Sequence, residues 1–287
     1  MTGVTSILSI QSSVAYGHVG NSAATFPLMR MGVEVWPVIT VHFSNHTGYG
    51  EWRGPLLAAS HVADVITGID ERGVLDRCDA VLSGYQGAAD VGAVILDAVA
   101  LVKSRNPSAI YCCDPVMGDV GRGFFVRPGI PEFMRDRVVP AAQIITPNQF
   151  ELEYLTGTLT STLDDVLSAA DRARELGPET VLVTSVVHDD ARPDTLDMVA
   201  VSSAGAWSVT TPLLPRAFQG AGDLTAATFL AKMLESGDVA TAVGQTAAVV
   251  YGVLQTTIDS GLGELQLVAA QDEIAHPTNS FPVQRLR

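Results

Sequence analysis

The chain has 287 residues, of which 47% are hydrophobic and 17% charged, and its formal net charge is −14. This length suits one large domain, and the apolar fraction is enough for an extensive core without disulfide staples. The acidic balance, with no long run of Lys or Arg, excludes duplex DNA or RNA as the expected partner. It does not exclude a nucleotide substrate, because backbone N–H groups and Mg²⁺ can hold phosphates inside an acidic protein.

The cysteines and the apolar runs indicate the cellular compartment of the protein. Three cysteines, two of them adjacent (Cys112 and Cys113), give neither a disulfide framework nor a C-x-x-C metal spacing, and indicate a reducing compartment. The N-terminal stretch MTGVTSILSI lacks the basic and long apolar regions of a signal peptide. No 18 apolar residues run unbroken, so no membrane span is expected. We therefore expect a cytoplasmic protein.

Short β-rich runs alternate with helix-like segments along the first 186 residues. The expected strands cover 6–10, 33–41, 80–83, 109–113, 143–146 and 180–186, and the expected helices lie near 20–31, 60–72, 88–105, 148–156 and 163–176. This alternation predicts an α/β fold in which helices cover both faces of a mostly parallel sheet.

The pattern changes after residue 186. The runs 195–203 and 206–214, separated by Ala204 and Gly205, predict an antiparallel hairpin at one edge of the sheet. Helices are expected at about 223–237, 239–258 and 266–274. No linker, repeat or low-complexity tract divides the chain, so we expect one domain over residues 1–287.

Several polar residues follow predicted strands, which is where ligands bind in open α/β sheets. Ser12, after the first strand, is either a turn or cap residue or a hydroxyl that contacts a polar substrate. The segment 42–52, HFSNHTGYGEW, contains Gly48 and Gly50, which disfavour the helix that a two-histidine zinc site would need. It is either an ordinary loop or a loop that binds a flat ring.

Asp114 ends a predicted strand and is followed by Pro115 and by a glycine-rich loop, of which 118–127 is expected to form a mobile flap. Asp114 is either an Asx-turn residue or a partner of nucleotide-bound Mg²⁺. Asn148 and Glu151 have the spacing of a capping box, and the same two residues could position hydrated Mg²⁺.

The stretch QGAGDLT (219–225) opens a predicted helix, where free N–H groups and the helix dipole favour an anion. Asp223 is itself an anion at this place. It is either the N-cap of the helix or a base that accepts a proton from an alcohol during phosphoryl transfer.

Taken together, these segments resemble a known family. IQSSVAYGHVGNSAATFPLMRMGVEVWPVITVHFSNHTGYGEW, SGYQGAA, CCDPVMGD, TPNQFELEYLTG, GAGD and LQLVAAQDEIAHP are similar to segments of the pyridoxal kinases of the ribokinase-like superfamily. The similarity covers nearly the whole chain. GAGD and DPVMGD are shared across the superfamily, whereas the N-terminal segments are specific to its vitamin B6 branch.

The resemblance implies a ribokinase-like three-layer α/β/α fold and a role for each matching residue. Asp223 would be the base that deprotonates the 5′-hydroxyl of pyridoxal, and Gly220, Ala221 and Gly222 would form the anion hole. Ser12, Thr47, Gly48 and Tyr85 would lie at the pyridine ring. The nucleotide side would comprise Asp114, Thr146, Glu151, Thr184, Thr211, Pro212, Leu213 and Leu214, of which Asp114 and Glu151 would hold Mg²⁺, mainly through water.

The resemblance also implies ATP as co-substrate, K⁺ as an activating ion, pyridoxine and pyridoxamine as further acceptors, and a homodimer. The chain departs from the family at Thr184, where some bacterial members carry Lys, in the loop 186–194, and in the approach to GAGD. Two alternatives stay open: a hydroxymethylpyrimidine kinase, and a weakly catalytic protein that binds vitamin B6.

Overall fold

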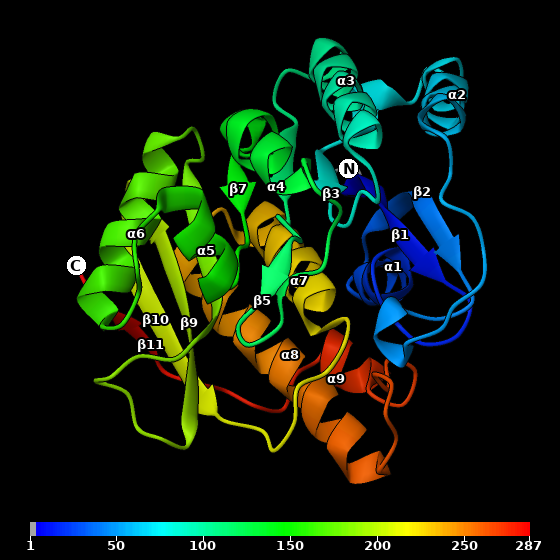
Figure 1. The fold of residues 1–287 in the computed structure, drawn as a ribbon. Coiled ribbons are helices and arrows are strands. Elements are labelled where there is room, and N and C mark those ends of the chain that lie inside the picture. Colours follow the sequence, from blue (N-terminus) through cyan, green and yellow to red (C-terminus); the bar gives the residue numbers. More distant parts are fainter. Residues whose placement is uncertain (1–3) are drawn as a thin grey trace.

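The computed structural model describes residues 4–287 and contains a nine-stranded sheet flanked by helices (Figure 1). The strands of this sheet are β1 (Ser6–Val14), β2 (Glu34–Phe43), β3 (Ala80–Ser83), β4 (Ile110–Cys113), β7 (Ile144–Ile145), β8 (Thr180–Val186), β9 (Thr195–Ser202), β10 (Gly205–Pro212) and β11 (Val283–Arg285). Their order is β11-β10-β9-β8-β7-β4-β3-β1-β2. The strands from β2 to β8 run parallel, and β9, β10 and β11 are antiparallel to their neighbours.

Helices cover both faces of the sheet. They are α1 (Asn21–Arg30), α2 (Ala59–Asp70), α3 (Ala89–Arg105), α4 (Ile130–Phe133), α5 (Gln149–Thr156), α6 (Leu163–Glu175), α7 (Ala221–Ser236), α8 (Val239–Ser260) and α9 (Gln271–Ala275). Because neighbouring side chains of a strand point to opposite faces, β1 contributes Leu8 and Ile10 to a core with α2, α3, α5 and α6. Its Ile7 packs in a second core with α1, α7 and α8. The three-layer prediction is thereby confirmed.

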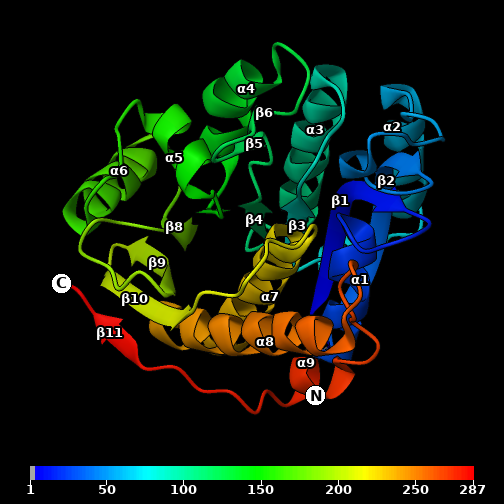
Figure 2. The ribbon, with the colours of Figure 1, turned by 60° about the horizontal axis from the view of Figure 1, so that its bottom comes forward.

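The C-terminal elements close the second face. Figure 2 shows α8 running across the molecule beside α7, with α9 near one end of α8 and β11 near the other. The predicted hairpin is confirmed as β9 and β10, but β11 lies outside it as the edge strand. We did not predict β11, because its three residues are all exposed and show no apolar alternation.

Several expected boundaries were wrong. β1 continues to Val14, so Ser12 lies within the strand instead of after it. Gln11 and Ser13 pair with β2, and Ser12 lies at a bulge between them. The last helix begins at residue 271 and not at 266.

The expected flap contains a small hairpin, β5 (Gly118–Asp119) paired with β6 (Gly123–Phe124). The Phe124 ring packs edge-on against Phe150 and Tyr154, with ring centroids 5.1 and 5.0 Å apart. Two aromatic contacts to α5 therefore anchor one strand of this loop, and its mobility stays a prediction.

Within residues 4–287, none of the helices combines the length and the apolar character needed to cross a bilayer. The stretch expected to lack a signal peptide starts with residues 1–3, which lie outside the described part of the chain.

Candidate active site

The parallel strands end at a cavity of about 1130 Å³. The fold brings nearly all the predicted site residues to its wall: Ser12, Thr47, Tyr85, Asp114, Thr146, Glu151, Thr184, Thr211, Pro212, Leu213, Leu214, Gly220, Ala221, Gly222 and Asp223. Gly48 is the exception. It sits in the 3₁₀ turn Thr47–Tyr49, where its backbone N–H donates to Nδ1 of His46, and it does not line the cavity.

The helix α7 begins without a side-chain cap. Gly220 is the N-cap, with a left-handed φ of 82°, and a Cβ here would collide with the carbonyl oxygen of His18. Only glycine meets both conditions. Asp223 is therefore the third residue of the helix and not its N-cap, so the alternative in which it is the N-cap of α7 was wrong. Gly220, Ala221 and Gly222 line the cavity, and the Ala221 N–H donates to the carbonyl oxygen of Phe218 at 3.4 Å.

The carboxyl group of Asp223 has a raised pKa. Burial raises the pKa of its carboxyl to about 6, and a hydrogen bond from the backbone N–H of Gly20 opposes this shift. A carboxylate with a pKa near neutrality is a better proton acceptor than an ordinary aspartate and is still ionised at pH 7.5.

Asp114 and Glu151 form a second acidic group near the amides of α7. Asp114 is 5% exposed and Glu151 3% exposed. Oδ1 of Asp114 accepts a hydrogen bond from Thr146 Oγ1 at 3.1 Å, while its Oδ2 faces Gly222. Burial, followed by the charges of Glu151 and Asp223, raises the pKa of Asp114 well above its ordinary value. A bound cation would favour the ionised forms of these two carboxyl groups and lower their pKa values again.

Glu151 has a structural function as well. The predicted capping box is confirmed, since Asn148 Oδ1 accepts from the Glu151 N–H and Glu151 Oε2 accepts from the Asn148 N–H at 3.0 Å. Its other oxygen accepts from the N–H of Met117 at 2.8 Å. Burial raises the pKa of Glu151 to about 8. Because both oxygens already have backbone donors, Glu151 is better placed to contact a metal through water than directly.

No cluster of three or more His, Cys, Asp or Glu side chains that could hold a metal alone occurs between residues 4 and 287. Two carboxyl groups of this kind would fit Mg²⁺, which keeps several waters and takes few ligands from the protein. They do not fit a permanently bound zinc ion, because within residues 4–287 no His or Cys joins them in a metal-binding cluster.

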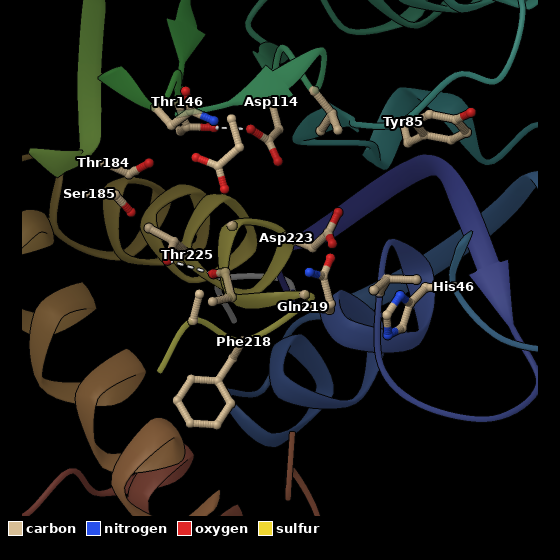
Figure 3. A pocket seen from close by; sticks show the side chains of 18 of the residues that line it. His46, Tyr85, Asp114, Thr146, Thr184, Ser185, Phe218, Gln219, Asp223 and Thr225 are labelled. Atoms are coloured by element: carbon tan, nitrogen blue, oxygen red, sulfur yellow. Dashed lines mark hydrogen bonds between the residues drawn. The ribbon is translucent and has the colours of Figure 1, made fainter. Parts of the chain in front are cut away.

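The cavity has two halves, with Asp223 between them. In Figure 3, Asp223 separates Thr184 and Ser185 on one side from Tyr85 and His46 on the other. The second half also includes Val19, Val41, Phe43 and Trp52, whose apolar and aromatic surfaces suit a flat ring. The first half is lined by Thr184, Ser185, Thr211 and the loop 212–216.

Sequence reasoning missed several residues that line the cavity. Ser185 has a φ of 55°, the only left-handed non-glycine backbone among residues 4–287, and nothing in its neighbourhood in the sequence signals this. The Gln149 side chain holds the adjoining backbone, donating to Val187 O at 3.0 Å and accepting from Val187 N at 3.1 Å. Arg122 and Arg127 line the cavity from the flap, and they could have been recognised as the two arginines of the expected flap 118–127 that follows Asp114.

Comparison with known proteins finds similar kinases. A family model described as phosphomethylpyrimidine kinase matches residues 60–267. The chain is similar to a pyridoxal kinase PdxY of Rubrobacter xylanophilus, with 60% identity over 99% of this chain and 98% of the relative. It is 57% identical to a pyridoxal kinase PdxY of Leifsonia xyli, over 98% of this chain and 99% of that one. A solved pyridoxal kinase from Leishmania donovani, in complex with ADP and pyridoxine, has a TM-score of 0.90 and 29% identity over 98% of this chain and 99% of its own.

Proposed function

The chain belongs to the pyridoxal kinase family of ribokinase-like enzymes, and we propose that it transfers the γ-phosphoryl group of ATP to the 5′-hydroxyl of pyridoxal. One observation carries the proposal. Asp223, whose carboxyl group has a raised pKa, and the start of α7, whose N-cap is a glycine, lie together in the cavity. They stand between its aromatic half and its hydroxyl-lined half. This is the arrangement that transfer from a nucleotide to a ring-borne alcohol requires.

In the proposed reaction the pyridoxal 5′-oxygen attacks the γ-phosphorus. A bond forms between these two atoms while the bond from the γ-phosphorus to the β–γ bridging oxygen breaks and ADP leaves. Asp223 accepts the proton of the attacking hydroxyl, which prevents formation of a positively charged oxygen. Its pKa of about 6 means that it enters the reaction ionised at neutral pH.

Charge on the transferring group is offset by the start of α7. In this proposal the backbone N–H groups of Gly220, Ala221 and Gly222, which line the cavity, would stabilise the charge on the three phosphoryl oxygens. Mg²⁺, when bound, would neutralise phosphate charge, and Asp114, with Glu151 through water, would hold it. Thr184, Thr211, Pro212, Leu213 and Leu214 would contact the nucleotide, as the Leishmania relative's complex with ADP supports.

We assign the aromatic half to the acceptor ring. Ser12 and Thr47 supply hydroxyl groups to the ring substituents, and burial raises the pKa of the Tyr85 phenol, which keeps it a neutral donor. A Leishmania relative is described with pyridoxine and another structure of it with pyridoxamine, so we propose both as further acceptors.

We further propose a cytoplasmic homodimer that uses K⁺ with Mg²⁺·ATP. The three buried free thiols, Cys78, Cys112 and Cys113, are consistent with a reducing compartment. The family resemblance supports the dimer and the monovalent ion. Light scattering at micromolar protein tests the dimer, and a monomeric mass would refute it.

The experiment that tests the function is a panel of acceptors in a coupled ADP assay. We expect pyridoxal to be phosphorylated with a higher kcat/KM than hydroxymethylpyrimidine. The second candidate, a hydroxymethylpyrimidine kinase, is favoured by the description of the family model alone and predicts the reverse order. Tight pyridoxal binding without ADP release would instead support a B6-binding protein.

A further inference from the structure

Glu264 is a buried carboxylate on the loop between α8 and α9, outside the set of residues that line the cavity. It is only 8% exposed, although the loop around it is at the surface. Burying a charged side chain is costly unless it is hydrogen-bonded, so its partners indicate what it does.

Two loops from the N-terminal part of the chain meet at this carboxylate. Oε2 accepts from the backbone N–H of His18 at 3.2 Å, and Oε1 accepts from the Tyr49 hydroxyl at 2.7 Å. Nε2 of His46 lies 3.4 Å from Oε1. Since Nδ1 of His46 accepts from the Gly48 N–H, the ring proton sits on Nε2 and faces Glu264. Three donors therefore converge on two oxygens.

His46 lines the cavity, and Tyr49 and His18 belong to the same loops as the lining residues Thr47 and Val19. Tyr49 and His46 flank Thr47, which we assign to the substrate ring. The carbonyl of His18 packs against Gly220, where the anion-hole turn begins, and Leu265 lies beside it. The hydrogen bond from Tyr49 also raises the pKa of that phenol to about 12.

The same loop is tied to the turn before α7. Arg216, four residues before Gly220, donates to the carbonyl oxygen of Leu262. The Gln266 N–H donates to Thr257 Oγ1 at 3.0 Å, which attaches the loop to α8. Residues 262–266 thus connect the ring-side turn 46–49, the loop 17–20 and the approach to GAGD.

We propose that Glu264 is a positioning residue that holds the ring-side turn and the anion-hole turn in fixed relation, so that the acceptor hydroxyl meets Asp223. The inference rests on the proposed function, and Glu264 itself touches no substrate. Only a carboxylate meets the requirement, because all three partners are donors and a carboxylate has acceptors alone.

The test is Glu264→Gln, which keeps the size of the side chain. An amide can accept on one side only, so its NH₂ group must face either His18 N–H or the Tyr49 hydroxyl. We expect kcat/KM for pyridoxal to fall about 10- to 100-fold, the range for losing hydrogen bonds to a charged group. KM for ATP should stay within about twofold, because no contact of Glu264 reaches the nucleotide half.

Glu273→Gln is the matched control. Glu273 also accepts from a backbone N–H and a hydroxyl, both of Thr278, in the same C-terminal region, but contacts no loop of the site. A Glu264→Gln enzyme that matches this control, or loses activity on both substrates in proportion to a lower melting temperature, would overturn the inference.

Tyr49→Phe keeps the inference testable if Glu264→Gln does not fold. Tyr49 is 52% exposed, so removing its hydroxyl leaves the core intact. We expect kcat/KM for pyridoxal to fall about three- to tenfold, as for one hydrogen bond. An unchanged value would contradict the proposal. In the Glu264→Gln background the same substitution should have a smaller effect, and full additivity would count against the coupling.

Hydrogen exchange separates this inference from the kinase assignment. In ligand-free Glu264→Gln, amides in 17–20 and 46–49 should exchange faster than in the unmodified chain, whereas Glu273→Gln should leave them unchanged. Unchanged exchange in both variants would sink the positioning role, whatever the substrate is. Failure of the unmodified chain to phosphorylate pyridoxal would refute the proposed function alone.

Discussion

Replacing Asp223 with Asn separates the proposed base from a purely structural carboxylate. The amide has nearly the same shape and can still receive the hydrogen bond from Gly20, but it cannot accept the hydroxyl proton. We expect kcat to fall by about 10²- to 10⁴-fold, the contribution typical of a general base. Binding of ATP should survive or tighten, because a negative charge beside the γ-phosphate is gone.

The structure also predicts that this variant is more stable. The pKa of Asp223 rises from 3.8 to about 6 on folding. A raised carboxyl pKa means that ionisation costs stability, with no cost below pH 3.8 and the full cost above pH 6. The shift corresponds to about 3 kcal/mol at most. Asn at this position should therefore melt several degrees higher at pH 8, with the difference vanishing toward pH 4.

The decisive experiment measures kcat in a coupled ADP assay and melting temperature on the same preparations at pH 4 to 8. A rise in stability with a large loss of turnover is the expected pair of results. A folded Asp223→Asn protein that keeps most of its turnover would refute the base. A variant that melts lower at pH 8 would refute the electrostatic reasoning.

Three further predictions concern the same site. Gly220→Ala should lower kcat at least about 100-fold by displacing the anion-hole turn. Gly32, whose backbone is also left-handed but whose Cβ would meet open space, gives the control: Gly32→Ala should lose stability and keep kcat. Equal kcat values for the two variants would contradict this prediction. The kcat/KM for pyridoxal should rise about tenfold per pH unit up to the pKa of Asp223 near 6 and then level off; a flat profile from pH 5 to 8 would exclude it as the base. Ser12→Ala and Thr47→Ala should each raise KM for pyridoxal about three- to tenfold and leave KM for ATP unchanged, and equal effects on both substrates would reject their assignment.

Much of this site could be predicted because its residues follow strands. The carboxyl ends of parallel strands meet at one edge of a sheet, so Asp114 after β4 and Thr146 after β7 had to come together. The capping box of Asn148 and Glu151 was predictable from spacing alone. The position of Asp223 within α7 was not, because the helix begins two residues earlier, at Ala221, where glycine replaces a side-chain cap.

Features that depend on long-range packing could not be predicted in this way. Glu264 meets His18 across 246 positions of the chain, and no local pattern indicates that contact. The left-handed backbone of Ser185 is set by a break in the register between β8 and β9 and by the Gln149 side chain, neither of which leaves a periodic signal. Tertiary constraints decide the backbone at such places.

The central claim is that this chain phosphorylates pyridoxal, and mass spectrometry of the reaction products tests it most directly. Pyridoxal is incubated with ATP, Mg²⁺, K⁺ and the purified protein, with the Asp223→Asn variant as the matched control. We predict pyridoxal 5′-phosphate and ADP in equal amounts from the unmodified protein, and a trace of both from the variant. Absence of pyridoxal 5′-phosphate, or ADP released without it, would contradict the account.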